Sequence, residues 1–194
     1  IFGLTDLLHP NQDTMKNTLL IILIVLSGVS AQAQNIGAPP EYVKALTSKW
    51  EGERYPDGRP KVSDNTLERL QNCTLEQIWG YLGKNGFHNQ FENNWIILKS
   101  GETMVGRAVT VQFMPTRPDL DTYIRAQGKT EGRNQRGGIN IWPIDILTKG
   151  DIYVADGFGK VKDGTLIGSS LGNAIYGKTG KGVVFYGSIR DMQE

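Results

Sequence analysis

Gly150-Asp151-Ile152-Tyr153-Val154-Ala155-Asp156-Gly157 is the stretch that decides the fold of this 194-residue chain. Turn-forming residues bound its apolar run, Ile152–Ala155, and this pattern predicts a short buried strand. A second run of this kind, Val183–Tyr186, follows a glycine-bounded segment, Leu171–Tyr176, that has the length of a short helix. A strand, a helix and a strand in this order favour an α/β layered domain over an all-β sandwich.

Predicted strands and helices also alternate in the chain upstream of this stretch. Two apolar segments, Trp95–Leu98 and Met104–Phe113, are predicted strands, and the second is rich in valine and threonine. Asp119–Glu131 is a predicted polar helix, and Ile144–Leu147 is a predicted short helix or turn. The alternation therefore extends the α/β prediction over the second half of the chain.

The segment before these strands is predicted to be mainly helical. Apolar residues recur at helix-like spacing in Glu41–Trp50. Glu51–Lys61 is a predicted loop, because it holds two glycines and two prolines. Ser63-Asp64 can cap a following helix with a long apolar stripe. The spacing leaves open whether that helix is continuous or breaks near Asn72.

Composition excludes several classes of protein. Hydrophobic residues make up 39% of the chain and charged residues 21%, which excludes a disordered chain or a collagen-like fibre. A net charge of +1 argues against a nucleic-acid partner, because proteins that bind nucleic acids normally carry a stripe of basic residues. The single cysteine, Cys73, excludes an internal disulfide and a cysteine-based zinc cluster. The two histidines, His9 and His88, exclude a site with several histidine ligands.

The N-terminal region carries the pattern of a secretory signal peptide over residues 15–33. Met15-Lys16-Asn17-Thr18 is a short positive segment, Leu19–Leu26 is apolar throughout, and Ala31-Gln32-Ala33 offers a cleavage site. The apolar run is short for a permanent membrane anchor, which is the alternative interpretation. We therefore expect an exported protein, periplasmic or secreted, cleaved near Ala33. Residues 1–14 are interpreted as translated upstream sequence and residues 34–61 as an N-terminal extension of a domain over 62–194.

Gly172–Thr179 fits the nucleotide-binding pattern G-x-x-x-x-G-K-[ST] letter for letter. That motif needs a strand before it and a long helix after it, so that helix amides face the phosphates. Here an apolar run begins at Val183, which leaves no room for a following helix, and the segment inside the motif is itself the predicted helix. The match is interpreted as accidental.

The C-terminal segment gathers groups that could bind a small acid. A glycine-flanked loop that leads into a helix exposes unpaired amides, which attract anions. Arg190 can grip a carboxylate with two hydrogen bonds. Asp191 and Glu194, one helical turn apart, can hold a hard divalent cation through oxygen ligands and waters. The alternative is that Arg190 and Asp191 form an ordinary surface ion pair.

Four stretches together resemble the RraA-like family, named after the regulator of ribonuclease activity A, which includes the 4-hydroxy-4-methyl-2-oxoglutarate aldolases. The resemblance covers roughly Val62–Glu194. The stretches are Val105-Gly106-Arg107-Ala108-Val109-Thr110, Gly150-Asp151 with Val154 and Asp156-Gly157, the Gly168 loop, and Gly187-Ser188-Ile189-Arg190-Asp191-Met192-Gln193-Glu194. The last is the most specific, since a loop glycine precedes Arg-Asp and an acid follows three residues later.

The resemblance implies a β/β/α swivelling-type layered domain, here incomplete at the C-terminus, assembled as a homotrimer or hexamer. It implies a metal-dependent class II aldolase or decarboxylase that cleaves a 4-hydroxy-2-oxo acid or oxaloacetate to pyruvate through a metal-stabilised enolate. Mg²⁺ or Mn²⁺ is the implied cofactor, with Asp191 as a direct ligand and Glu194 acting through water. Arg190 would polarise the 2-oxo group.

The resemblance also implies a substrate-binding loop. Its implied members are Gly168, Ser169, Ser170 and Leu171, where the amides near Ser170 and Leu171 would bind the pyruvate carboxylate. Ser169 stands where aldolases of this family commonly have an acidic residue, and a serine is a poor base. A non-catalytic binding or regulatory protein is therefore the alternative. Some relatives inhibit a cytoplasmic ribonuclease by contact, but the predicted signal peptide would place this chain in another compartment.

Overall fold

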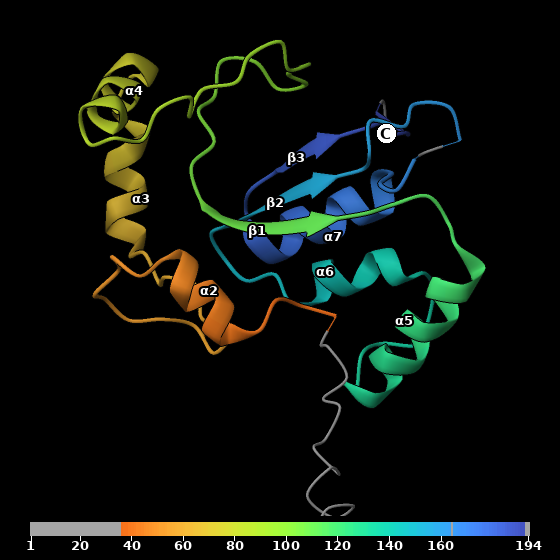
Figure 1. Ribbon diagram of the computed structural model, residues 1–194. Helices are drawn as coiled ribbons and strands as arrows, with labels where there is room; N and C mark the ends of the chain where they lie inside the picture. The colour runs from red at the N-terminus through yellow and green to blue at the C-terminus, as the bar shows by residue number, and fades with distance from the viewer. Residues whose placement is uncertain (1–35, 164, 193–194) are drawn as a thin grey trace, which may run out of the picture. The chain divides into compact units, whose positions relative to one another are not determined.

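The computed structural model describes residues 36–163 and 165–192 (Figure 1). The predicted leader over residues 15–33 and the fourteen residues before it lie outside the described residues. The helices are α2 (Pro40–Leu46), α3 (Asp64–Gln71), α4 (Leu75–Lys84), α5 (Pro118–Thr130), α6 (Trp142–Asp145) and α7 (Ser169–Thr179), with a 3₁₀ helix, η1, at Ile139–Ile141. No helix in the described part of the chain has the length and apolarity needed to cross a bilayer.

The sheet has three parallel strands in the order β1-β2-β3. They are β1 (Arg107–Gln112), β2 (Asp151–Asp156) and β3 (Val183–Tyr186). Parallel neighbours need a crossover, which α5, η1 and α6 supply between β1 and β2, and α7 between β2 and β3 (Figure 1). The α/β prediction is confirmed at this level, as a mixed domain with a small parallel sheet.

The core lies on the face of the sheet that α7 covers. Alternate residues of a strand point to the same side, so Val109 of β1 joins Tyr153 and Ala155 of β2 on this face. Ile175 of α7 packs against them and is almost fully buried. The remaining buried members of the cluster come from the crossovers: Ile144, Leu147 and Ile167.

A buried acid joins the start of the sheet to the N-terminal segment. The Asp151 side chain has no solvent exposure, and its Oδ2 accepts hydrogen bonds from the amide and hydroxyl of Thr148 at 2.9 and 3.0 Å. Its Oδ1 faces two arginines, Arg59 at 3.5 Å and Arg107 at 3.7 Å. Arg107 also donates to the carbonyl of Val62 at 2.6 Å. Two stretches of the family resemblance, those of Arg107 and Asp151, thus meet in one ion cluster.

The structure settles the open question about the helix after Ser63. The Ser63 hydroxyl accepts from the amide of Thr66 at 3.2 Å and begins α3. The chain then breaks at Asn72 and Cys73, because the Thr74 side chain caps a new helix, α4, in a capping box with Gln77. Two helices therefore replace the single apolar stripe.

The strand predicted at Trp95–Leu98 is wrong. This segment has no secondary structure, and the Ile96 side chain is 90% exposed. Its composition favours a strand, but it has no neighbouring strand within the described residues to complete its hydrogen bonds. Two other predicted elements are shorter than expected: Met104–Phe113 forms a strand only over β1, and the helix predicted over Glu41–Trp50 ends at Leu46.

Candidate functional site

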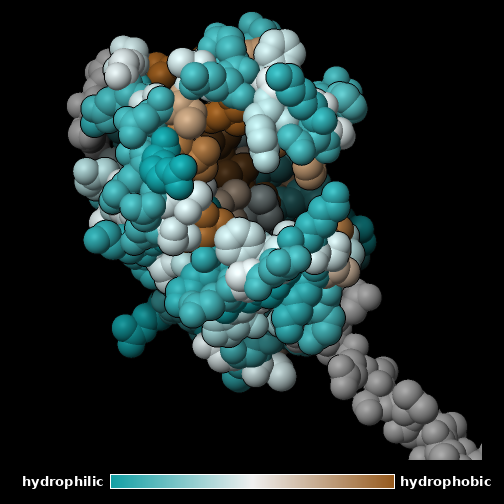
Figure 2. All heavy atoms as spheres, turned by 90° about the vertical axis from the view of Figure 1, so that its left-hand side faces the viewer, coloured by the Kyte–Doolittle hydropathy of each residue, from teal (hydrophilic) through white to brown (hydrophobic). Residues whose placement is uncertain are grey.

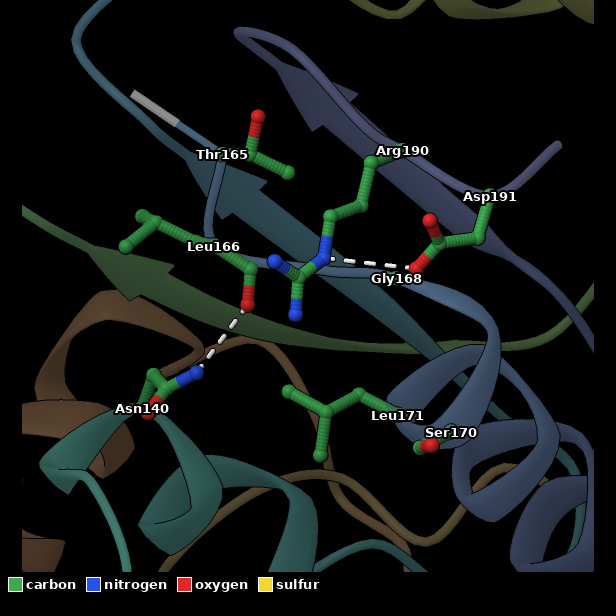
Figure 3. A pocket seen from close by; sticks show the side chains of 8 residues that line it. All are labelled: Asn140, Thr165, Leu166, Gly168, Ser170, Leu171, Arg190 and Asp191. Atoms are coloured by element: carbon green, nitrogen blue, oxygen red, sulfur yellow. Dashed lines mark hydrogen bonds and ion pairs between the residues drawn. The ribbon is translucent and has the colours of Figure 1, made fainter. Parts of the chain in front are cut away.

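The site forms where the chain leaves β2 and β3. Ile167, in the loop after β2, makes a parallel bridge with Ile189, just after β3. The amide of Arg190 donates to the carbonyl of Ile167 at 3.2 Å. This short pairing places Gly168, at the start of α7, directly beside Arg190 and Asp191 (Figure 3).

A pocket of about 130 Å³ lies at this junction. Its lining residues are Asn140, Thr165, Leu166, Gly168, Ser170, Leu171, Arg190 and Asp191. The structure therefore brings together five of the seven residues that the sequence singles out. Ser169 does not line the pocket, and Glu194 lies outside the described residues.

Gly168 allows the close approach of the two charged side chains. A Cβ atom at this position would lie 2.5 Å from Asp191 Oδ2 and 2.8 Å from Arg190 Nε. Both distances are too short for any side chain, so the pocket in this form requires a glycine here.

Arg190 and Asp191 form an ion pair that remains open to solvent. Arg190 Nε lies 3.3 Å from Asp191 Oδ2, and the two side chains are 71% and 37% exposed. The left-handed backbone of Asp191, with φ of +58°, turns its carboxylate back toward Gly168. An exposed pair of this kind contributes little stability. The exposure of the pair is what the alternative, an ordinary surface ion pair, predicts, and both side chains also line the pocket.

The start of α7 offers amides to the same pocket. Gly168 is the N-cap and has no side chain to satisfy the first amides of the helix. Within the described residues, the amides of Ser169, Ser170 and Leu171 have no hydrogen-bond acceptor. Figure 3 shows the Arg190 guanidinium pointing into the space between Leu166 and Leu171, across from this helix start. Amides and guanidinium together provide a positive environment that suits a carboxylate.

Three lining residues were missed by the sequence analysis: Asn140, Thr165 and Leu166. Asn140 belongs to η1, and its side-chain amide donates to the carbonyl of Leu166 at 3.0 Å. It thereby ties the first crossover to the loop that precedes α7. The Thr165 hydroxyl lies 3.2 Å from that of Ser188. No local pattern marks Asn140, because only the packing of the crossovers brings it to the pocket.

The oxygen donors of the pocket suit a divalent ion that takes few ligands from the protein and keeps most of its water. Asp191 is the one carboxylate among its described lining residues, and the hydroxyls of Thr165 and Ser170 are further oxygen donors. The described part of the chain holds no group of three or more histidine, cysteine, aspartate or glutamate residues that could bind a metal. Mg²⁺ commonly takes one or two carboxylates and fills its shell with water and substrate oxygens. An oxygen-only set with one carboxylate meets that requirement.

The nucleotide-binding pattern lies inside a helix. Residues 172–179 belong to α7, so their backbone cannot form a loop around phosphates. Lys178 Nζ donates to the carbonyl of Asp145 at 2.9 Å. Thr179 is buried, and its hydroxyl donates to the carbonyl of Ile175 at 2.8 Å. The structure thus agrees with the interpretation of this match as accidental.

Comparison with known proteins adds one finding. A family model described as RraA-like, Aldolase/RraA, matches residues 60–194, well over half of the chain. No curated protein and no solved structure matches the chain significantly.

Proposed function

This chain belongs to the RraA-like family, which includes aldolases and regulators, and from that premise we propose that it is a divalent-metal-dependent lyase. It cleaves a 4-hydroxy-2-oxo acid, or decarboxylates oxaloacetate, and releases pyruvate. In a 4-hydroxy-2-oxo acid the C4 hydroxyl gives up its proton and C4 leaves as a carbonyl compound, whereas in oxaloacetate C4 leaves as CO₂. In both cases the electron pair of the C3–C4 bond passes toward the 2-oxo oxygen, and protonation of C3 then gives pyruvate. Negative charge therefore develops on one oxygen, and the site has to stabilise that charge.

The observation that carries the proposal is the meeting of Arg190, Asp191 and the first amides of α7 around Gly168. The amides bind the substrate carboxylate, which fixes its 2-oxo group near the guanidinium. Arg190 donates hydrogen bonds to the 2-oxo oxygen, and these strengthen as charge builds up there. Asp191 holds the divalent ion. When bound, Mg²⁺ or Mn²⁺ supplies Lewis acidity that withdraws electron density from the 2-oxo group.

The size of the pocket supports a small substrate. Its volume of about 130 Å³ is well below the roughly 300–1,000 Å³ of sites for drug-sized ligands. A short 2-oxo acid has the right size for this volume, whereas a nucleotide or a larger cofactor is too large.

We extend the proposal to the remaining features that the resemblance implies. The domain is of the swivelling β/β/α type, Glu194 acts on the ion through water, and the protein assembles as a homotrimer or hexamer. The leader pattern over residues 15–33 supports export. The net charge of +1 supports a small-molecule substrate rather than a nucleic acid.

Pyruvate release tests the proposal directly. The protein is incubated with oxaloacetate and with a 4-hydroxy-2-oxo acid, first with Mg²⁺ or Mn²⁺ and then with a chelator. We expect turnover that the chelator abolishes and added metal restores. Turnover that is absent, or that persists in the chelator, contradicts the proposal.

Arg190→Ala is the decisive variant. Loss of one preorganised donor to a developing oxyanion costs about 10²–10³ in kcat. Arg117→Ala is the matched control, because Arg117 is also an exposed guanidinium (62%) paired with a nearby acid, Asp119, at 2.6 Å. The control should keep full activity.

A regulatory binding protein is the second candidate, and Ser169 favours it. A serine replaces the acid that commonly supports proton transfer in the aldolases, and it lies outside the pocket lining. In that case oxaloacetate or pyruvate would raise the melting temperature of the protein without turnover. The two candidates thus differ in product formation and share ligand binding.

A further inference from the structure

We propose that Lys160 and Lys162, in the loop between β2 and α7, are specificity-determining residues that bind a second carboxylate at the far end of the ligand. The inference rests on the proposed function for the first end of that ligand, a 2-oxo acid. It goes beyond that function because neither lysine lines the pocket, and neither is among the residues that the family resemblance implies.

The loop that carries the two lysines is fastened to the pocket wall. The Ser188 hydroxyl, just after β3, donates to the carbonyl of Val161 at 2.9 Å, and Val161 stands between the two lysines. The same hydroxyl lies 3.2 Å from that of Thr165, which lines the pocket. One side chain therefore joins the backbone of the loop to the pocket wall, so Lys160 and Lys162 branch from the backbone beside the pocket.

Contacts at the start of the loop fix its course as it leaves β2. The amide of Lys160 donates to the carbonyl of Gly157 at 3.2 Å, which closes a turn. Gly159, inside this turn, has a φ of +61°, and a Cβ atom there would lie 2.9 Å from the hydroxyl oxygen of Tyr186. The turn thus packs closely against the end of β3, and the two lysines stand on a folded segment of defined position.

The two lysines are available to an anionic ligand. Both are exposed. Within the described residues, the lysines that form ion pairs are Lys61 and Lys99, so no described acid pairs with Lys160 or Lys162. Asp163 follows them, and the loop stretch of two lysines and one aspartate keeps a net charge of +1. Each ammonium group stands on a flexible four-carbon stem, which lets it turn toward an anion.

The direction of the bound acid points toward this loop. Figure 3 shows Ser170 and Thr165 on opposite sides of the Arg190 guanidinium. In the proposed function, the first carboxylate lies at the start of α7 and the 2-oxo group lies at Arg190. The rest of the acid then extends toward Thr165, and thus toward the wall to which the loop is fastened.

A second carboxylate needs a positive partner that the pocket itself does not provide. Arg190 is the one cationic side chain among the described lining residues, and the 2-oxo group already uses it. A carboxylate that loses water without a partner is costly. Lys160 and Lys162 supply the partner beside the Thr165 wall.

Another conspicuous surface of the molecule is unsuited to this role. Figure 2 shows, on the side where α3 and α4 lie, apolar side chains in a hollow with hydrophilic ones around it. Apolar side chains give a carboxylate no charged partner, and removing its water there would be unfavourable. We therefore assign the far carboxylate to the loop beside the pocket.

Binding of two inert acids tests the assignment without any turnover. 2-Oxoglutarate and 2-oxopentanoate share a five-carbon chain and a 2-oxo group, and both lack the 4-hydroxyl group that aldol cleavage requires. They differ at C5, which is a carboxylate in the first acid and a methyl group in the second. Calorimetric titration of the full chain with Mg²⁺ present measures both Kd values. We expect 2-oxoglutarate to bind about tenfold more tightly, the gain that two exposed ion pairs supply.

Lys160→Gln combined with Lys162→Gln should bring the two Kd values within about twofold of each other. Lys44→Gln combined with Lys49→Gln is the matched control, because it removes the same charge from two exposed lysines in and just after α2, outside the pocket lining. The control should keep the preference for 2-oxoglutarate. Added salt should weaken that preference in the unchanged chain, since it screens exposed charges.

Two results would overturn the assignment: equal Kd values of the unchanged chain for the two acids, or a preference that survives in the Lys160/Lys162 variant. Absence of binding by both acids would overturn it together with the proposed function. Failure of the lyase activity alone is distinguishable, because it appears as missing pyruvate release from the reactive acids while the preference between the inert acids remains.

Discussion

At the scale of single residues, the site depends on the lack of a side chain at Gly168. Gly168 lets the guanidinium of Arg190 and the carboxylate of Asp191 come within contact distance of the α7 start. Each of these groups is common on protein surfaces, and their chemistry depends on this close approach. The geometry can therefore be tested without removing any functional group.

Gly168→Ala should lower activity strongly while the fold is kept. The new Cβ atom would lie within 3 Å of both charged side chains, so the Arg190–Asp191 pair must shift from its present position. We expect kcat/KM for pyruvate release to fall about 10²-fold or more, as after loss of an oxyanion donor.

Gly172→Ala is the control on the same helix. No atom lies within 4 Å of a Cβ built at Gly172. Alanine should stabilise α7 by about 0.5–1 kcal/mol and leave kcat/KM unchanged. Equal activity losses in both variants would show that α7, rather than the approach at Gly168, determines the effect.

Arg107→Ala should be among the most destabilising single changes. It removes one of the two arginines that face Asp151, whose carboxylate has no solvent exposure. Removing one partner of a buried ion pair costs up to about 3–5 kcal/mol, and the contacts of the Asp151 carboxylate with Arg59 and Thr148 that remain reduce this loss. Urea denaturation measures the loss, with Arg117→Ala as an exposed control that should cost less than about 1 kcal/mol. Similar values for the two variants would contradict the buried cluster.

At the scale of elements, prediction succeeded where a segment carries its own signals. Ser63 was predicted to cap a helix, and α3 begins directly after it. Val183–Tyr186 is apolar between glycines and forms β3 as predicted. Trp95–Leu98 has the composition of a strand but no strand beside it, and pairing is what a strand requires. Composition alone could not reveal that missing neighbour.

The contact between α5 and Trp142 sets a strict limit on side-chain size. A Cβ atom at Gly128 would collide with the indole ring, which is 4% exposed and donates to the carbonyl of Asn134 at 2.5 Å. Gly128→Ala should cost about 1–3 kcal/mol of unfolding free energy through overpacking. Gly80→Ala, in α4, meets no atom within 4 Å and should be neutral or stabilising in the same urea measurement.

Tyr153, in β2, should make the stability of the protein sensitive to alkaline pH. Burial raises the pKa of the Tyr153 phenol well above its usual value near 10. A raised pKa in the folded state stabilises the fold while the phenol stays neutral. This contribution is complete below about pH 10, the unfolded pKa, and declines as the pH rises above it.

Unfolding free energies between pH 8 and 11 test the role of Tyr153. Above pH 10 the stability of the unchanged protein should fall more steeply than that of Tyr153→Phe, which has no ionisable group in β2 at this position. Equal slopes for the two proteins would mean that another group controls the alkaline loss.

At the scale of the whole molecule, the site is a product of topology. Arg190 and Asp191 are neighbours in sequence, and their pairing could be predicted. Asn140 reaches the same pocket from the first crossover, through its hydrogen bond to Leu166. That contact depends on how the crossover from β1 to β2 packs against the crossover from β2 to β3. Residue spacing within either segment does not predict this packing.

Ligand binding should stabilise the whole fold. Oxalate is a planar dianion that resembles the charge distribution of the pyruvate enolate. At about 100 times its Kd, a ligand selective for the folded state adds about 2.7 kcal/mol, and at about 2–4 °C per kcal/mol this raises Tm by roughly 5–10 °C. The shift should require Mg²⁺ or Mn²⁺ and vanish in Asp191→Asn. A shift that is independent of metal would contradict the role of Asp191.

None of the described pocket walls comes from a strand: the lining residues lie in loops, in η1 and at the start of α7. The scaffold and the recognition surface are therefore encoded by different stretches of the gene. Changes in the loops can therefore alter what the pocket accepts, while the hydrogen bonds of the sheet stay intact. Such a separation lets descendants of a single ancestor diverge in chemistry without first becoming unstable.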